Sequence, residues 1–402
     1  MSILEAQKSI ISGSITPPGS KSIAHRAMIC SFLAGGGEVN GITPSKDITA
    51  TASAIEALKC KKDTIDCCES GSTLRFMLPV AAALGKSVTF TGRGRLPERP
   101  IGEYLRLFGE HGVKCRSKGG LPLTVEGRLT SGEYSLAGDV SSQYVTGLLL
   151  ALPLLEGDSK IVLTSPLQSK PYVDITVSVM KEYGIEVKEE DNAYFVRGLQ
   201  EYKKTNYTVE SDWSQAAFFL ASGAIGGNVS VKGLNPNSAQ GDKQIINVLK
   251  RFGAELEIKD DTVNIRKSAL KGINVNVSDI PDAVPAIAVC AAFAKGKTVI
   301  TGGERLRFKE SDRLESVASN LTKMGINATQ TADGLIIGGG EPKAAELCGY
   351  NDHRIVMAFS VAAVNCEGVT RITDAESIEK SYPEFFGDLK SLGGRINVIR
   401  DR

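Results

Sequence analysis

Hydroxyl and cationic side chains gather in one short segment near the start of the chain. Residues 17–26 read Pro-Pro-Gly-Ser-Lys-Ser-Ile-Ala-His-Arg, and an apolar run follows. The prolines predict an extended segment that becomes a helix at Ser20. The free N–H groups of the first helical turn, the hydroxyls of Ser20 and Ser22 and the ammonium of Lys21 would then meet, which suits a phosphate or a carboxylate. Taken alone, the segment fits equally well an ordinary serine N-cap beside a solvated lysine.

The same kind of helix opening recurs along the chain, and this favours an anion site. Each opening is polar or charged and is followed by a helix that is rich in Ala and Leu. The six openings lie near Lys21, 71–73, 141–143, 212–214, Asp282 and 352–354. Helices that are apolar on all sides are buried. Their N-termini would collect on one face of each domain and form an anion-attracting field.

Cations stand at these openings and at the starts of a second set of helices. They are Lys21, Arg26, Arg75, Arg99, Lys170, Lys309, Arg313, Arg354 and Lys380. A single one of them would be interpreted as a solvated surface charge, but their shared placement indicates a binding role. The planar guanidinium groups suit bidentate contacts with carboxylates and phosphates.

Two acids among these cations, Asp282 and Glu310, are candidates for proton transfer. Each also fits a helix cap or a partner for a helix dipole. In a cleft, the charges of neighbouring groups tune the pKa of such a carboxyl. The residues alone leave both interpretations open.

A repeat of about 70 residues organises the elements that must position these groups. Amphipathic helices alternate with the apolar ones, and five of them end at a glycine followed by short alternating strands. These glycines are Gly112, Gly184, Gly253, Gly325 and Gly393. Their place after a helix predicts the C′ conformation, and their spacing suits a small α/β subunit used six times. We therefore expect two α/β domains, one of residues 12–210 and one of residues 1–11 with 211–402, in which the N-terminal strand pairs with the strand 395–400.

Bulk composition excludes several classes of function. The chain has 402 residues and a net charge of +1, which gives no field suited to nucleic acid or to a membrane surface. No basic segment followed by an apolar one opens the chain, so we expect no signal peptide. The longest apolar run, 145–155, is too short to span a bilayer. Eight scattered cysteines and three distant histidines predict reduced thiols in a cytoplasmic protein and no metal site.

Seven segments together resemble the 5-enolpyruvylshikimate-3-phosphate synthase family. In the order of the chain they are Gly19–Arg26, Glu98–Gly102, Ser141–Gln143, Ser169–Tyr172, Pro281–Asp282, Arg307–Leu314 and Asn351–Arg354. The groups Lys309–Arg313 and Asn351–Arg354 are specific signatures. The resemblance implies a two-domain inside-out α/β barrel with six βαβαββ repeats, three per domain, and an active site in the cleft between the domains.

The resemblance also implies an activity in the shikimate pathway of aromatic amino acid biosynthesis. The family transfers the enolpyruvyl group of phosphoenolpyruvate to the 5-hydroxyl of shikimate 3-phosphate and releases phosphate. It needs no cofactor and no metal, and it is the target of glyphosate. We expect a cytoplasmic monomer whose partners are these two small molecules, with no nucleic acid and no membrane.

Two alternatives accompany this expectation. One is the sister transferase acting on UDP-N-acetylglucosamine, which usually has a reactive cysteine in a mobile loop. Here Cys115 falls in a predicted strand, so we expect a structural thiol. The other is a non-catalytic anion-binding protein of the same fold, and the intact Asp282 and Glu310 argue against it.

Site roles are carried over from the family residue by residue. The residues implied to bind shikimate 3-phosphate are Lys21, Ser22, Arg26, Ser141, Ser142, Gln143, Ser169, Asp282 and Lys309. Those implied to bind phosphoenolpyruvate are Lys21, Gly71, Arg99, Gln143, Arg313, Arg354 and Lys380. Three residues are implied to be catalytic: Asp282 as the base at the 5-hydroxyl, Glu310 as the acid at the methylene carbon, and Lys21.

Two positions depart from the family pattern. Glu69 stands where Asn is more common, and we expect it to turn away from the phosphate site or to pair with a cation. Arg305 replaces an Asn found in one branch of the family, so we assign it no substrate contact.

Overall fold

The computed structural model describes residues 2–400, and the chain divides into two compact units. Gly19–Val209 forms one, here called the N unit. The chain up to Pro18 and from Glu210 onward forms the other, the C unit. Strand β2 (Ser12–Ile15) pairs with β13 (Asn228–Val231), so 12–18 belong to the C unit, whereas the sequence placed them in the other domain.

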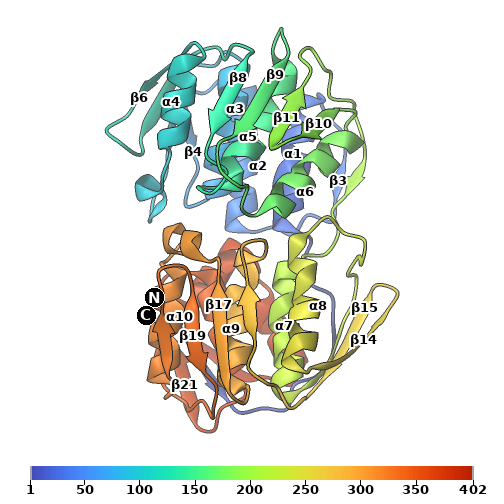
Figure 1. Ribbon diagram of the computed structural model, residues 1–402, viewed down its shortest axis with the longest axis vertical. Helices are drawn as coiled ribbons and strands as arrows, with labels where there is room; N and C mark the ends of the chain where they lie inside the picture. Colours follow the sequence, from blue (N-terminus) through green and yellow to red (C-terminus); the bar gives the residue numbers. More distant parts are fainter. Residues whose placement is uncertain (1, 401–402) are drawn as a thin grey trace. The chain divides into compact units, whose positions relative to one another are not determined.

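Three apolar and three amphipathic helices belong to the N unit, and Figure 1 shows them among the strands of the unit. The apolar helices are α1 (Lys21–Leu33), α3 (Gly71–Ala83) and α5 (Ser142–Ala151). The amphipathic helices are α2 (Lys46–Lys59), α4 (Gly102–Glu110) and α6 (Lys170–Glu182). Helix α5 packs against α3 at Gly147, where any Cβ would collide with the carbonyl of Arg75. A glycine is therefore required at this helix contact.

Three sheets surround the helices of the N unit. The first has the order β4 (Thr64–Asp66), β5 (Val88–Thr91), β7 (Leu123–Gly127), β6 (Val113–Arg116). The second has the order β10 (Val187–Glu190), β11 (Ala193–Val196), β9 (Ser159–Leu163), β8 (Glu133–Leu136). The third contains only β12 (Tyr207–Thr208) and β3 (Val39–Asn40). The short 3-10 helices η1 (Leu96–Glu98) and η2 (Leu152–Leu154) complete the unit.

The C unit follows the same plan. Its apolar helices, which pack against one another, are α7 (Trp213–Gly226), α9 (Val284–Phe293) and α11 (His353–Ala363). Its outer helices are α8 (Ile245–Phe252), α10 (Arg313–Lys323) and α12 (Phe385–Ser391). Its 3-10 helices are η3 (Gly241–Gln244), η4 (Pro281–Ala283), η5 (Glu304–Phe308) and η6 (Ala375–Lys380).

Three four-stranded sheets belong to the C unit. One has the order β14 (Glu255–Lys259), β15 (Thr262–Arg266), β13, β2. Another has the order β16 (Asn274–Asn276), β17 (Lys297–Thr301), β19 (Leu335–Gly338), β18 (Ala328–Gln330). The third has the order β20 (Glu346–Leu347), β21 (Val369–Ile372), β1 (Ser2–Gln7), β22 (Arg395–Arg400). The predicted pairing of the N-terminal strand with the last strand is confirmed.

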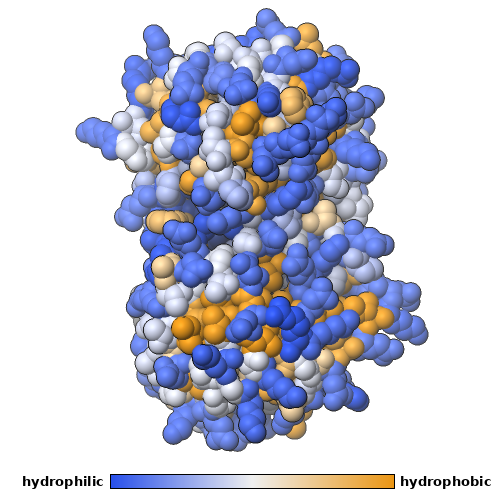
Figure 2. Space-filling model, viewed as in Figure 1, coloured by the Kyte–Doolittle hydropathy of each residue, from blue (hydrophilic) through white to orange (hydrophobic). Residues whose placement is uncertain are grey.

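All the four-stranded sheets share one pairing pattern. Each has one parallel pairing at one edge, followed by two antiparallel pairings. The two antiparallel strands form a hairpin in every case except β1 and β22, which come from the two ends of the chain. The five repeat glycines all have positive φ, between 80° and 99°, as the C′ prediction requires. Alternation along β19 buries Leu335 and Ile337 and exposes Ile336. Figure 2 shows apolar residues gathered over β17 and β19 on this visible face of the C unit.

Candidate functional site

The first helix of the N unit begins at a cation that already has a carboxylate partner. Lys21 opens α1, and its Nζ lies 2.6 Å from Oδ2 of Asp47 at the start of α2. Ser20 is the N-cap residue, but its side chain does not cap the helix, and the described residues provide no partner for its buried hydroxyl. The helix start therefore keeps donors that an anion can use, next to a half-buried Ser22.

Arg26 lies one turn further along α1 and is buried. Its Nε donates to Oγ1 of Thr176 over 2.7 Å, and its Nη1 donates to the carbonyl of Ser22 over 2.6 Å. Its Nη2 donates to the carbonyl of Tyr172 over 2.9 Å. Burial lowers the pKa of Arg26 to about 9, so the group is still cationic at neutral pH. Arg26 thus joins α1 to α6, whose buried N-cap residue is Ser169.

Gly71 and Arg99 meet at the start of α3. A Cβ added to Gly71 would lie 2.5 Å from Nη1 of Arg99 and 3.0 Å from Nη1 of Arg75. The guanidinium of Arg99 therefore packs directly on the backbone at this helix N-terminus. Ser70 caps the helix, since its Oγ accepts from the N–H of Thr73 over 3.2 Å.

Gln143 reaches the same region from the start of α5. Its backbone N–H donates to Oγ of Ser141, the N-cap, over 3.3 Å, and Ser142 between them is buried. Its side-chain amide bonds to two residues of α3, Ser72 and Arg75. The candidate site residues Gly71, Arg99 and Gln143 therefore lie in one region of the N unit.

Arg313 is the centre of the corresponding cluster in the C unit. It begins α10, and its side chain is 1% exposed. Its Nη1 lies 3.0 Å from Asp282, its Nη2 2.8 Å from Glu310 and its Nε 2.8 Å from Asp352. Burial acts to lower the pKa of Arg313, but the carboxylates of Asp352, Glu310 and Asp282 outweigh it and raise the pKa above its ordinary value.

Asp282 contacts three cations. Besides Arg313, its Oδ2 lies 3.1 Å from Nη2 of Arg354, and its Oδ1 lies 3.5 Å from Nζ of Lys309. Arg354 is buried and also donates to Oγ of Ser214 over 2.9 Å. Opposite charges at these distances favour the ionised form of a carboxylate.

Neither candidate acid acts as a helix cap. No side chain caps η4, which contains Asp282. The cap of α10 is Asp312, whose Oδ1 accepts from the N–H groups of Leu314 and Glu315. The side chains of Asp282 and Glu310 are 17% and 19% exposed, so both carboxyl groups are partly accessible to solvent.

Lys380 ends η6 and is buried. Its Nζ donates to the carbonyl of Asn351 over 2.6 Å, which places it beside the start of α11. Lys170, by contrast, sits at an exposed surface of the N unit and pairs with Asp174 and Glu189. It therefore does not join the other cations of its unit.

Sequence reasoning missed the partners that hold these groups. Asp47 holds Lys21, and the fully buried Asp352 holds Arg313 while capping α11 through the N–H of Arg354. Asp352 appeared in the sequence only as part of the helix opening 352–354 and of the signature Asn351–Arg354, with no role of its own.

The two departures from the family pattern have structural settings of their own. The carboxylate of Glu69 lies against Gly94, where an added Cβ would be 2.6 Å from Oε2. Arg305 donates from Nη2 to the carbonyl of Ser278 over 2.9 Å and so anchors η5.

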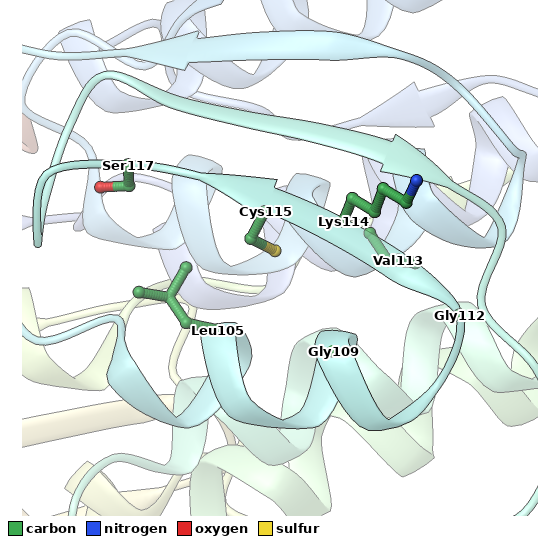
Figure 3. A pocket seen from close by; sticks show the side chains of 7 residues that line it. All are labelled: Leu105, Gly109, Gly112, Val113, Lys114, Cys115 and Ser117. Carbon is green, nitrogen blue, oxygen red and sulfur yellow. The ribbon is translucent and has the colours of Figure 1, made fainter.

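Cys115 lies in strand β6, as predicted, and lines a groove of about 530 Å³. Figure 3 shows Cys115 and Leu105 facing each other from β6 and α4. Burial raises the pKa of Cys115 to about 11, so the thiol is protonated at neutral pH and is a poor nucleophile.

Within residues 2–400, no cluster of three His, Cys, Asp or Glu could hold a metal ion, and no helix is long and apolar enough to cross a membrane.

Comparisons with known proteins give one consistent result. A model of the family EPSP synthase (3-phosphoshikimate 1-carboxyvinyltransferase) matches residues 6–66 and 59–389. Proteins named 3-phosphoshikimate 1-carboxyvinyltransferase from Clostridium kluyveri and Clostridium acetobutylicum are each 41% identical, over 96% and 99% of both chains. A solved EPSP synthase from Acinetobacter baumannii is 28% identical, with a TM-score of 0.83 over the full length of both chains. The enolpyruvyl transferase NikO from Streptomyces tendae shares the fold, with a TM-score of 0.79 at 16% identity over 100% of this chain and 99% of its own.

Proposed function

The chain belongs to the EPSP synthase family, and we propose that residues of both units act on the same two substrates. The protein is an enzyme that transfers the enolpyruvyl group of phosphoenolpyruvate to the 5-hydroxyl of shikimate 3-phosphate and releases phosphate. This reaction belongs to the shikimate pathway. Both substrates are anions, which accords with the cations at the helix starts of each unit.

One observation carries the assignment of catalytic roles. Asp282 and Glu310 are partly exposed acids held by the same buried guanidinium, that of Arg313. In our proposal, Asp282 accepts the proton of the 5-hydroxyl of shikimate 3-phosphate. The hydroxyl oxygen then bonds to the central carbon of phosphoenolpyruvate. Glu310 donates a proton to the methylene carbon, which becomes a methyl group. Lys21, kept near Asp47, supplies positive charge close to the reacting groups.

The second half of the reaction follows from conservation of atoms. The product keeps a carbon–carbon double bond, so the proton added at the methylene carbon has to leave again. We propose that Glu310 takes a proton back from this carbon as the carbon–oxygen bond to phosphate breaks, and that the proton held by Asp282 leaves with the phosphate. A group that first donates and then accepts must carry a proton when the reaction begins. The hydrogen bond from Nη2 of Arg313 fixes the position of the Glu310 side chain.

In the same proposal, each substrate is bound by residues of both units. Shikimate 3-phosphate is held by Lys21, Ser22, Arg26, Ser141, Ser142, Gln143, Ser169, Asp282 and Lys309. Phosphoenolpyruvate is held by Lys21, Gly71, Arg99, Gln143, Arg313, Arg354 and Lys380. The donors at the starts of α1, α3 and α5 support the assignments made to the N unit. The cluster around Arg313 supports those made to the C unit.

We also propose the finer architecture and the setting of the enzyme. The pairing pattern shared by the four-stranded sheets supports an origin in six βαβαββ repeats, three per domain, arranged as an inside-out barrel, with the two-stranded sheet as a shortened member. Eight cysteines without disulfide partners support a reducing, cytoplasmic setting. We propose a monomer, which sedimentation of the purified chain would test.

Phosphate release tests the function directly. We expect release when phosphoenolpyruvate and shikimate 3-phosphate are both present and none with either alone. UDP-N-acetylglucosamine in place of shikimate 3-phosphate should give none. Absence of release with both proposed substrates, or turnover with the UDP-sugar instead, would overturn the proposal.

A further inference from the structure

Arg75 is a buried cation of the N unit with no role in the scheme above. It lies in α3, and its guanidinium carbon is 5.6 Å from the ring centre of Tyr144. Its Nη1 donates to Oε1 of Gln143 over 3.0 Å, and its Nη2 donates to the carbonyl of Pro100 over 2.8 Å. Both partners belong to segments that carry substrate-binding residues in the proposed function.

The contact with Gln143 determines which way its amide faces. A guanidinium only donates hydrogen bonds, so it requires the amide oxygen on its side. The Nε2 group then turns to Ser72 and donates to its Oγ over 3.0 Å. One Nε2 hydrogen is used in that bond, and the second remains for an oxygen of a substrate. The reversed amide would place N–H donors against the cation and lose the contact with Arg75, whereas the hydroxyl of Ser72 could donate to the amide oxygen in that orientation, so Arg75 is the group that selects the observed one.

The contact with Pro100 holds the backbone that follows Arg99. The carbonyl of Pro100 also accepts from the hydroxyl of Tyr144, so two donors from two helices hold this one carbonyl. Nη1 of Arg75 and Nη1 of Arg99 both come close to the same spot, at 3.0 Å and 2.5 Å from a Cβ added to Gly71. A shift of Arg75 would therefore move the guanidinium of Arg99 at the start of α3.

We propose that Arg75 is a positioning residue for both substrates. It presents Gln143 as a donor and holds Arg99 against Gly71, without touching a substrate itself. The planar fork of its guanidinium serves two acceptors in different directions, which the single ammonium of a lysine cannot reproduce. This inference rests on the proposed function, because Gln143 and Arg99 act in it as substrate ligands.

The test compares Arg75→Met and Arg75→Lys with the wild type and with Arg106→Met. Arg106 is an exposed arginine of α4 bonded to Glu103 and Glu110, and its variant should keep wild-type kinetics. Removing a hydrogen bond from a charged donor typically reduces affinity by about tenfold or more. We expect Arg75→Met to raise KM by that amount for both substrates, with a smaller change in kcat, and Arg75→Lys to recover only part of the loss.

A double-mutant cycle separates positioning from a purely structural role. If Arg75 acts on shikimate 3-phosphate through Gln143, Arg75→Met should raise that KM less than threefold in a Gln143→Ala background. The KM for phosphoenolpyruvate should still rise there, because Arg99 is still disturbed. The inference would be overturned if Arg75→Met raised both KM values by the same factor in the Gln143→Ala background as in the wild type, and lowered Tm equally in both.

Ser72→Ala keeps the inference testable if Arg75→Met does not fold. It removes only the other anchor of the Gln143 amide, and we expect KM to rise severalfold for both substrates. Unchanged KM values in Ser72→Ala and Arg75→Lys, measured beside an active wild type, would overturn this inference and leave the proposed function standing. An inactive wild type would overturn the proposed function itself.

Discussion

Arg313 and Asp352 form a buried ion pair in the C unit. Nε of Arg313 lies 2.8 Å from Oδ2 of Asp352, and Nη2 lies 3.3 Å from Oδ1. Their side chains are 1% and 0% exposed. Asp352 also accepts from Ser311 and caps α11, while the remaining donors of Arg313 serve Asp282 and Glu310. Asp352 thus fixes the guanidinium that orients both proposed catalytic acids.

Asp352→Asn should destabilise the protein strongly. Asparagine is still a good N-cap, but the buried guanidinium of Arg313 loses its main counter-charge. Breaking one side of a buried ion pair typically costs about 3–5 kcal/mol. The matched control is Asp312→Asn, a half-buried N-cap aspartate on α10, which should lose about 1 kcal/mol or less. Urea unfolding of both variants checks this, and equal losses would contradict the assigned role of Asp352.

Glu310→Gln should bind both substrates and lose turnover. The amide keeps the shape of the carboxyl and can still face Arg313, but it cannot deliver a proton to carbon. Loss of general acid catalysis typically lowers the rate by about a hundred- to ten-thousand-fold. Glu315→Gln, an exposed acid in the first turn of α10, is the control and should stay near wild type. Steady-state phosphate release measures both, and a near-normal kcat in Glu310→Gln would refute the proton-transfer role.

Gly71→Ala should weaken phosphoenolpyruvate binding through Arg99. The new methyl carbon would lie only 2.5 Å from Nη1 of Arg99, so the guanidinium would have to move away. Overpacking of this kind typically costs about 1–3 kcal/mol. We expect KM for phosphoenolpyruvate to rise more than KM for shikimate 3-phosphate. At Gly102 an added Cβ meets nothing within 4 Å, so Gly102→Ala should leave both constants unchanged. Equal KM shifts for the two substrates in Gly71→Ala would argue against the contact.

Cys115→Ser should leave turnover unchanged within about twofold, because a protonated thiol in a strand is not a nucleophile at pH 7. With its pKa raised to about 11, Cys115 should react with iodoacetamide faster as pH rises from 7 toward 11. Mass spectrometry of the alkylated peptide follows that rate. Loss of turnover in Cys115→Ser would favour the chemistry of the UDP-N-acetylglucosamine transferases.

His25 should make the protein less stable in acid. Burial, followed by the charges of Lys21 and Arg26, lowers the pKa of His25 well below its ordinary value of 6.5. Below pH 6.5 the unfolded chain binds a proton there that the folded chain does not, so stability falls as pH falls, by up to about 1.4 kcal/mol per pH unit. Urea unfolding at pH 5.0 and 7.5 measures this. His25→Gln, which can still bond to Thr51, should show a smaller difference between the two pH values; an equal difference would exclude His25 as the cause.

Much of the secondary structure could be predicted because its causes are local. Apolar helices that open at polar residues are visible in any short window, and so are glycines at helix ends. Each repeat glycine indeed has the positive φ that its position requires. Segments such as 309–313 and 351–354 marked the candidate site residues because their residue types follow one another directly in the chain.

The partners of those residues were decided only by the tertiary structure. Asp352 reaches Arg313 across 39 residues, and Arg75 reaches Gln143 across 68, so no local pattern records either contact. Burial then determines the consequence, because a charge or an amide removed from water must find a partner or pay a large desolvation cost. The sequence by itself therefore determined which residues carry charge at the helix starts. The packing of the helices decided which carboxylate orients Arg313 and which way Gln143 turns.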